Sequence, residues 1–228
     1  MSSSPAFTAG SALHQQLHQG LEALGLSLPA QAESRLLAFA GLMLKWNKTY
    51  NLTALRQPEA IVTHHLLDSL AILPPLQARL DAAGRLLDVG SGGGLPGIPL
   101  AIACPELEIT LVDSNSKKVA FLKQAAIELG LRQVRAECAR VEQLDASRPW
   151  PLISSRAFAE LELFVRLTRP LLAAGGQWLA MKGLYPEQEI ALLPAGITVR
   201  ETLPLTVPGV AGERCLLVLE SPGGGQND

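Results

Sequence analysis

One short stretch of the chain has residue types that can bind a nucleotide-like ligand. Residues 86–97, LLDVGSGGGLPG, run from an apolar segment through Asp88 into a turn that contains Gly90, Gly92 and Gly94. Glycines suit such a turn because the backbone must adopt left-handed angles and approach a ligand closely, which a Cβ atom would prevent. The pattern predicts a strand, a tight turn and a helix, the place where α/β proteins hold nucleotide-like ligands.

This glycine turn fits two cofactor templates. Counted from Asp88 it is Asp-x-Gly-x-Gly-x-Gly, the form used by S-adenosylmethionine enzymes, and counted from Gly92 it is the Gly-x-Gly-x-x-Gly of dinucleotide binders. Asp88 favours the first template, because a carboxylate here can pair with the ammonium group of the methyl donor. Pro96 also favours it, since a proline in the first helical turn offers no N–H group to a pyrophosphate. On these residues alone, a NAD-linked oxidoreductase stays open as the alternative.

Further candidate residues follow the later predicted strands. Asp113 ends the second strand, where a carboxylate can accept hydrogen bonds from ribose hydroxyls; the other interpretation is a residue that helps to begin a helix. Val141 and Glu142 follow the third strand and could hold the edge of an adenine. Arg156 closes the fourth strand and Lys182 the fifth. Because the carboxyl ends of parallel strands face the ligand crevice, we expect these two cations at the site rather than on a solvated face.

The hydrophobic pattern divides the chain into two parts. Residues 11–80 have apolar residues at helical spacing, with a break at 47–51 and a third helix from Pro58 to the prolines at 74–75. From residue 85 onward, strands alternate with helices, which predicts an α/β fold with a mostly parallel, seven-stranded sheet covered on both faces. The expected strands lie near 85–89, 108–113, 134–138, 151–155, 176–182, 197–203 and 214–220, and the helices near 97–103, 117–129, 160–170 and 186–193.

These patterns predict the organisation of the chain. We expect an N-terminal helical part over 1–83, a catalytic domain over 84–221 and a flexible tail over 222–228. The last two strands are separated by prolines and glycines and should form an antiparallel pair. The helical part, with His64 and His65, could cover the ligand crevice or contact the substrate, or it could only pack on the sheet.

Composition and charge limit the class of protein. The chain has 228 residues, of which 48% are hydrophobic and 18% charged, as in globular proteins. We see no secretory leader and no apolar run long enough for a membrane span, so we expect a cytoplasmic protein. The three cysteines are far apart and predict neither a disulfide framework nor a metal site. The net charge is −2, yet residues 114–182 carry eleven basic and six acidic side chains, which could meet phosphates or form an ordinary solvated surface.

Several motifs in one order resemble the RsmG (GidB) family of bacterial 16S rRNA guanine-N7 methyltransferases. The motifs are WNKTYNLT at 46–53, HHLLDS at 64–69, GLPGIP at 94–99, SRAF at 155–158 and MKG at 181–183. The resemblance implies a Rossmann-like S-adenosylmethionine-dependent methyltransferase fold and a substrate of 16S rRNA within a small-subunit particle. It implies that S-adenosylmethionine is contacted by Gly90, Leu95, Val141, Glu142 and Arg156. It also implies that the RNA is positioned by Arg140, Arg156 and Lys182.

The chemistry of the implied reaction agrees with the residues available. Guanine N7 is an unprotonated acceptor, so its methylation needs alignment with the methyl donor and no general base. We therefore expect Arg140, Arg156 and Lys182 to position phosphate or the guanine O6 rather than to move a proton. We expect a monomer without a metal. The second alternative, beside the oxidoreductase, is a non-catalytic binding module on a methyltransferase fold.

Overall fold

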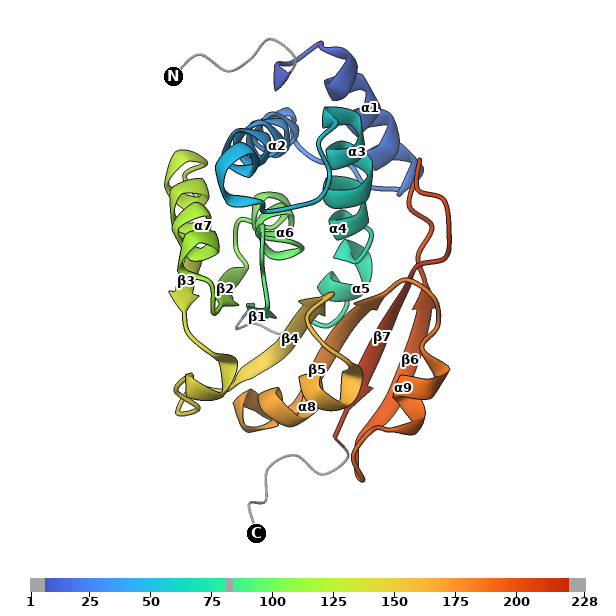
Figure 1. Cartoon of the computed structure of the whole chain (residues 1–228). Coiled ribbons are helices and arrows are strands. Elements are labelled where there is room, and N and C mark those ends of the chain that lie inside the picture. The colour runs from blue at the N-terminus through green and yellow to red at the C-terminus, as the bar shows by residue number, and fades with distance from the viewer. Residues whose placement is uncertain (1–6, 81–83, 222–228) are drawn as a thin grey trace.

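A single mixed sheet organises the molecule, shown in Figure 1 as a computed structural model that describes residues 7–80 and 84–221. Within these residues the sheet has seven strands in the order β3-β2-β1-β4-β5-β7-β6. The first five strands in this order run parallel, and β7 runs antiparallel to both β5 and β6. The strands are β1 (Arg85–Val89), β2 (Glu108–Asp113), β3 (Val134–Cys138), β4 (Trp150–Arg156), β5 (Leu172–Lys182), β6 (Thr198–Pro204) and β7 (Cys215–Glu220).

Helices cover both faces of the sheet, because its central strands are apolar on both sides. In β1, Leu86 faces one hydrophobic cluster and Leu87 the other, and both are completely buried. The first cluster packs against α1 (Ala12–Ala23), α2 (Ala30–Tyr50), α3 (Pro58–Ile61), η2 (Val62–Leu67), α4 (Asp68–Leu70), α5 (Leu73–Gln77), α6 (Gly97–Ala103) and α7 (Ser116–Glu128). The second packs against η3 (Val141–Gln143), α8 (Leu161–Thr168), η4 (Arg169–Leu171) and α9 (Glu187–Ala191).

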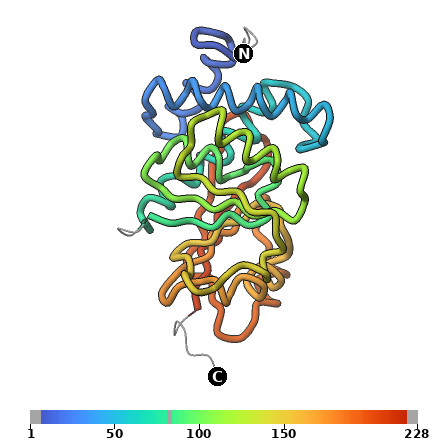
Figure 2. Tube along the Cα trace, turned by 90° about the vertical axis from the view of Figure 1, so that its left-hand side faces the viewer, coloured from blue at the N-terminus to red at the C-terminus, as the bar shows by residue number. Residues whose placement is uncertain are grey.

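The N-terminal helices are part of the first layer and share its hydrophobic cluster. Leu17, Leu36 and Leu66 of α1, α2 and η2 are completely buried in the same cluster as Leu86 of the sheet. Figures 1 and 2 show these helices at one end of the molecule and α8 and α9 at the opposite end. The stretch η2 is a π-helix, a local widening that often marks functional positions. It carries His64 and His65 toward the carboxyl ends of the strands.

The fold class predicted from the sequence is confirmed, including the antiparallel final pair. The predicted strands and the helices around α6 to α9 match the structure within a few residues. The break expected at 47–51 lies only at the last residue of that range, since α2 continues to Tyr50 and ends at Asn51 in a left-handed conformation. Helix α2 continues past Asn47 because the buried Asn47 amide bonds to the following loop, donating to the Leu55 carbonyl and accepting from the Thr53 N–H.

Two helix ends also differ from the prediction. The third helical stretch ends at Leu70, and the prolines at 74–75 belong to the separate short helix α5, which tolerates proline in its first turn. Pro96 is the residue before α6 rather than inside its first turn. The boundary proposed at residue 83 stays a prediction, and the tail at 222–228 lies outside the described residues. No helix in the described part of the chain is long and apolar enough to cross a membrane.

Candidate active site

The carboxyl ends of β1 to β4 surround a cavity of about 460 Å³. Each strand contributes the residues at its end or just beyond it: Val89 and Gly90 after β1, Val112 to Ser114 after β2, Ala139 to Glu142 after β3, and Ala157 and Phe158 after β4; Lys118 and Leu167 complete the wall. Such an edge is where open α/β sheets bind ligands. The volume lies within the range that accommodates a nucleoside-sized ligand.

The glycine turn after β1 forms the floor of this cavity. Gly90 has a φ of 67°, and a Cβ atom at this position would collide with the ring of Phe158. The turn is fixed to the next strand, since the Ser91 N–H donates to the Val112 carbonyl at 3.0 Å and the Val112 N–H donates to Ser91 Oγ at 3.1 Å. The glycine is therefore required both by its backbone conformation and by the close approach of an aromatic ring.

Asp113 faces the cavity from the end of β2 and is held in place by the backbone. Its Oδ2 accepts from the Gly92 N–H at 2.9 Å, and its Oδ1 accepts from the Asn115 N–H at 2.8 Å. Lys118 Nζ lies 4.0 Å from Oδ2. Each carboxylate oxygen has two lone pairs, so both retain capacity for a ligand hydroxyl. Gly92 thus contributes by orienting Asp113, and it does not line the cavity itself.

Val141 and Glu142, predicted to follow the third strand, lie beside this cavity, together with Arg140, which the resemblance implied for positioning the RNA. Arg140, Val141 and Glu142 line the cavity at the start of η3. Val141 is buried, whereas Glu142 is exposed. A buried apolar side chain beside an exposed carboxylate can contact the face and the polar edge of a flat heterocycle.

Asp88 lies beneath the turn and does not line the cavity. The carboxylate is completely buried, with Oδ1 accepting from the Ser154 hydroxyl at 3.0 Å and Oδ2 accepting from the Gly97 N–H at 3.2 Å. Burial raises the pKa of Asp88 to about 6. In this structure the carboxylate joins β1, β4 and α6, so the predicted pairing with a ligand ammonium group has no direct contact to support it. Gly94 and Leu95 also pack away from the cavity.

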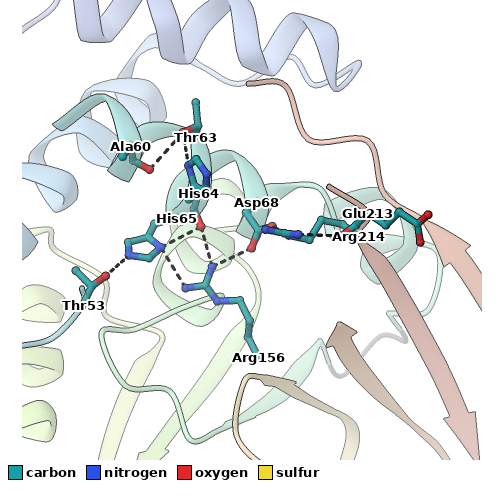
Figure 3. Close-up of polar contacts among 9 residues, drawn as sticks. All are labelled: Thr53, Ala60, Thr63, His64, His65, Asp68, Arg156, Glu213 and Arg214. Atoms are coloured by element: carbon teal, nitrogen blue, oxygen red, sulfur yellow. Dashed lines mark hydrogen bonds and ion pairs between the residues drawn. The ribbon is translucent and has the colours of Figure 1, made fainter. Parts of the chain in front are cut away.

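The structure separates Arg156 and Lys182 from this cavity. Arg156 turns toward η2 and the start of α4, where its Nη1 donates to the His64 carbonyl at 3.1 Å and to Asp68 Oδ2 at 2.9 Å, as Figure 3 shows. Lys182 Nζ pairs with Glu189 Oε2 at 2.6 Å and reaches the Ala159 carbonyl at 3.4 Å. Both cations remain at the carboxyl ends of their strands, as predicted, but each is held by a carboxylate.

Asp68 connects three distant segments of the chain. Besides Arg156 from β4, its Oδ1 accepts from Arg214 Nε, just before β7, at 3.2 Å (Figure 3). His65 lies beside this cluster, and its Nε2 is 2.7 Å from the Thr53 hydroxyl. Burial, with Arg156 as the next cause, lowers the pKa of His65 to about 4, so the ring is neutral at pH 7. The histidine pair is therefore part of this cluster.

Some lining residues were not predicted from the sequence. Phe158 and Lys118 are the clearest cases, together with Ser114, Ala139 and Leu167. A signal existed for Phe158, which lies two residues beyond the end of the fourth strand and within the motif at 155–158. Ala157 has a φ of 56°, and this unusual conformation for a non-glycine residue brings Phe158 over Gly90. Among the described residues, no group of three histidine, cysteine or acidic side chains could hold a metal ion.

Comparison with known proteins identifies the family. Residues 32–217 match the family model GidB, described as rRNA small subunit methyltransferase G. The chain belongs to this family. Ribosomal RNA small subunit methyltransferase G of Laribacter hongkongensis is 52% identical over 207 residues, which cover 91% of this chain and 98% of that protein. The protein of the same name from Chromobacterium violaceum is 52% identical over 202 residues, covering 89% and 95%.

Solved structures show the fold of this methyltransferase G family member. A glycopeptide N-methyltransferase, MtfA, complexed with S-adenosyl-L-methionine has a TM-score of 0.59 at 12% identity, covering 70% of this chain and 96% of that one. An S-adenosylmethionine-dependent methyltransferase from Aquifex aeolicus has a TM-score of 0.58 at 16% identity, covering 75% and 97%. The sheet and its helices therefore form the methyltransferase fold, and family membership removes the oxidoreductase alternative.

Proposed function

We propose that this protein transfers the methyl group of S-adenosylmethionine to N7 of a guanosine in 16S rRNA, with a small-subunit ribosomal particle as substrate. The observation that carries the proposal is the cavity at the ends of β1 to β4, which combines Gly90, Asp113 and Glu142 in a member of the methyltransferase G family. The names of the relatives support ribosomal RNA of the small subunit as the substrate. Because ribosomal particles are assembled in the bacterial cytoplasm, this substrate implies that the protein acts there.

The residues of the cavity fit the methyl donor. Asp113 would accept from the ribose hydroxyls, and Val141 and Glu142 would hold the adenine. Gly90 leaves room for the ligand where any side chain would meet Phe158. When bound, S-adenosylmethionine supplies an electrophilic methyl group on a sulfonium ion. Asp88 would act indirectly, because its bonds to Ser154 and Gly97 hold β1, β4 and α6 around the turn.

The remaining task of the protein is to align the guanine and exclude water. N7 carries no proton at neutral pH, so no side chain needs to act as a base. In the part of the chain that the structure describes, Nε of Arg156 has no hydrogen-bond partner, and its Nη2 lies only near His65 Nδ1, at 3.3 Å. These groups could donate to a phosphate or to guanine O6 without releasing Asp68. Arg140 lines the donor cavity and could bind a phosphate at its rim.

The RNA must expose its guanosine to this edge. In A-form RNA, N7 lies in a deep and narrow groove that side chains do not enter. We therefore expect a target in an irregular loop, or one that leaves the stack, with recognition based on shape and phosphates. The overall charge of −2 suits a substrate presented by a ribosomal particle better than binding to free RNA by charge alone.

The proposal is tested by incubating the protein with S-adenosylmethionine and unmethylated small-subunit particles, followed by mass mapping of the rRNA. We expect one additional methyl group on one guanosine, located at N7 by its sensitivity to strand cleavage after reduction and aniline treatment. The matched control is the Gly90→Ala protein. Calorimetry should show binding of S-adenosylmethionine and S-adenosylhomocysteine and none of NAD. Donor binding with no methyl transfer to any particle would instead support the non-catalytic binding module.

A further inference from the structure

A second cavity, of about 500 Å³, opens at the other half of the same sheet edge. It is formed by the segment after β5 and by the connection from β6 to β7, and its walls include Tyr185, Leu205, Thr206, Val207, Val210 and Arg214. We propose that this cavity binds an unpaired nucleotide of the RNA substrate, adjacent to the target guanosine. The proposal rests on the proposed function and extends it from the reacting base to a neighbouring one.

Tyr185 supplies a surface for stacking. Its side chain is 50% exposed at the wall of the cavity, which is unusual for a large aromatic residue in this chain. Its hydroxyl group makes no hydrogen bond within the described residues, so the ring is not committed to the fold. Unpaired bases of RNA are commonly held by stacking on aromatic side chains. The apolar wall of Leu205, Val207 and Val210 would shield the opposite side of the base.

Arg214 supplies the cation for a phosphate and is held in a fixed orientation. Its Nε donates to the buried Asp68, and its Nη1 donates to the Glu213 carbonyl at 2.8 Å. Nη2 has no hydrogen-bond partner in the part of the chain that is described. Because Asp68 orients the guanidinium from outside the cavity, the free edge of Arg214 can meet an anion without a further loss of side-chain freedom.

The same carboxylate connects this cavity to the end of β4. Asp68 binds Arg156 through Oδ2 and Arg214 through Oδ1, so the two guanidinium groups lie on either side of one buried acid, as Figure 3 shows. Two positive charges on one negative charge leave the cluster attractive to phosphates. A strand of RNA that places its guanosine near Arg156 would therefore continue toward Arg214 and Tyr185.

The lining favours a nucleotide over other ligands. Glu213 also lines the cavity, and its carboxylate disfavours a group with several phosphates while it can accept from the amino group of a base. Thr202 and Thr206 add hydroxyl groups that can bond to a sugar. A purely apolar peptide segment would cover Nη2 of Arg214 and the Glu213 carboxylate without giving either group a hydrogen-bond partner, at a cost in binding.

The test compares Tyr185→Ala with Tyr185→Phe in methylation of small-subunit particles. Since the loss of one stacked base weakens binding substantially, Tyr185→Ala should raise KM for the particle roughly tenfold or more. We expect its kcat, and its affinity for S-adenosylmethionine in calorimetry, to stay within about twofold of the wild type by the same reasoning, because the ring lies outside the donor cavity. Tyr185→Phe should restore KM, because it keeps the ring.

Leu192→Ala is the matched surface control. Leu192 is 64% exposed and does not line the cavity, so its truncation should leave KM unchanged. Irradiation of the protein bound to particles should also cross-link the peptide that contains Tyr185 to an rRNA nucleotide next to the target guanosine. A KM for Tyr185→Ala equal to that of the wild type, or a cross-link to a ribosomal protein instead of RNA, would overturn this proposal. Methylation by the wild-type protein would still support the proposed function in that case. Absence of methylation by the wild type would refute the proposed function itself.

Discussion

The two halves of the sheet edge differ in how their charged groups are used. Around β1 to β3, the carboxylates of Asp113 and Glu142 face an open cavity. Around β4, β5 and β7, the cations are paired with carboxylates of the chain itself, Arg156 and Arg214 with Asp68 and Lys182 with Glu189. In the proposed function, the first half holds the small methyl donor. The second half holds its cations in fixed positions, so a bound RNA has to use their remaining N–H groups or compete with the carboxylates.

The largest effect is expected from Gly90→Ala, which should strongly weaken donor binding in the first half of the sheet edge and leave the second half intact. Alanine at a φ of 67° is strained by roughly 1–2 kcal/mol, and its Cβ would also collide with Phe158. At about 1.4 kcal/mol per factor of ten, the strain alone corresponds to roughly five- to thirtyfold. The collision with Phe158 adds to it, so affinity for S-adenosylmethionine in calorimetry should fall by roughly a hundredfold or more.

Gly25→Ala separates strain from collision in this experiment. Gly25 has a φ of 69°, and a Cβ atom at this position would have no other atom within 4 Å, so the substitution adds strain alone. It should lower the melting temperature slightly and leave donor affinity unchanged. If Gly90→Ala bound the donor as tightly as Gly25→Ala does, the floor of the cavity would be assigned wrongly.

The second expected effect is a pH dependence of the free energy of unfolding, and it comes from His65 beside Arg156 in the second half of the edge. The pKa of His65 is lowered from 6.5 to about 4, so the unfolded chain takes up a proton before the folded one does. The stability that comes from neutral His65 is therefore complete above pH 6.5 and is lost as the pH falls through 4, by up to about 3 kcal/mol. Denaturant unfolding at several pH values should show this loss in the wild type.

His65→Gln is the comparison for this pH effect. Glutamine keeps hydrogen-bonding capacity toward Thr53 but cannot be protonated, so the difference in free energy of unfolding between wild type and variant should shrink between pH 6.5 and 4. Asp88 contributes with the opposite sign, because burial raises its pKa to about 6, and this contribution cancels in the difference. A difference that does not change with pH would contradict the neutral state of His65.

Asp113→Asn should have a somewhat smaller effect, confined to the donor half. The amide keeps an acceptor for the Asn115 N–H but loses the charge that strengthens bonds to hydroxyl groups. Hydrogen bonds to charged groups contribute roughly 1.5–3 kcal/mol, so donor affinity should fall by about ten- to a hundredfold. Asp145→Asn is the matched control, because Asp145 makes the same bond to the N–H two residues on, at 2.8 Å, outside the donor cavity.

The smallest effect is expected from Lys182→Ala, in the RNA half. Because the amino group is already paired with Glu189, it has only part of its charge and hydrogen-bonding capacity left for the RNA. Its loss should therefore lower turnover or particle affinity by only roughly tenfold, with donor affinity unchanged. Arg166→Ala removes a comparable pair, Arg166 with Glu162, from the surface and should be silent. Wild-type kinetics for Lys182→Ala would remove this lysine from the site.

The donor half was largely predictable from the sequence and the RNA half was not. Gly90 follows β1, Asp113 ends β2 and Glu142 lies in η3 after β3, and the carboxyl ends of parallel strands meet at one edge, so order along the chain determines their position. The role of Asp88 could not be predicted, because the burial of a side chain depends on α6 and β4 packing against it. An acidic residue at this position suggested contact with a ligand, but in the folded chain its carboxylate is buried and bonds only to other residues of the protein.

The RNA half depends on contacts between residues far apart in the chain. Arg156 and Asp68 are 88 positions apart, and Asp68 and Arg214 are 146 apart. No local pattern indicates that these side chains meet, since α4, which begins at Asp68, and the segment before β7 reach the edge by different routes. The motifs at 64–69 and 155–158 marked the segments of Asp68 and Arg156 as distinctive, but only the folded structure shows that one carboxylate joins them to each other and to Arg214 (Figure 3).

The most direct test of this division is hydrogen–deuterium exchange of the whole protein with each ligand added separately. S-adenosylmethionine should slow exchange at residues 89–94 and 139–142, and small-subunit particles with S-adenosylhomocysteine should additionally slow it at 183–186 and 205–214. Protection of 183–186 and 205–214 by the donor alone, or of neither segment by the particle, would contradict the assignment of donor and RNA to opposite halves of the edge.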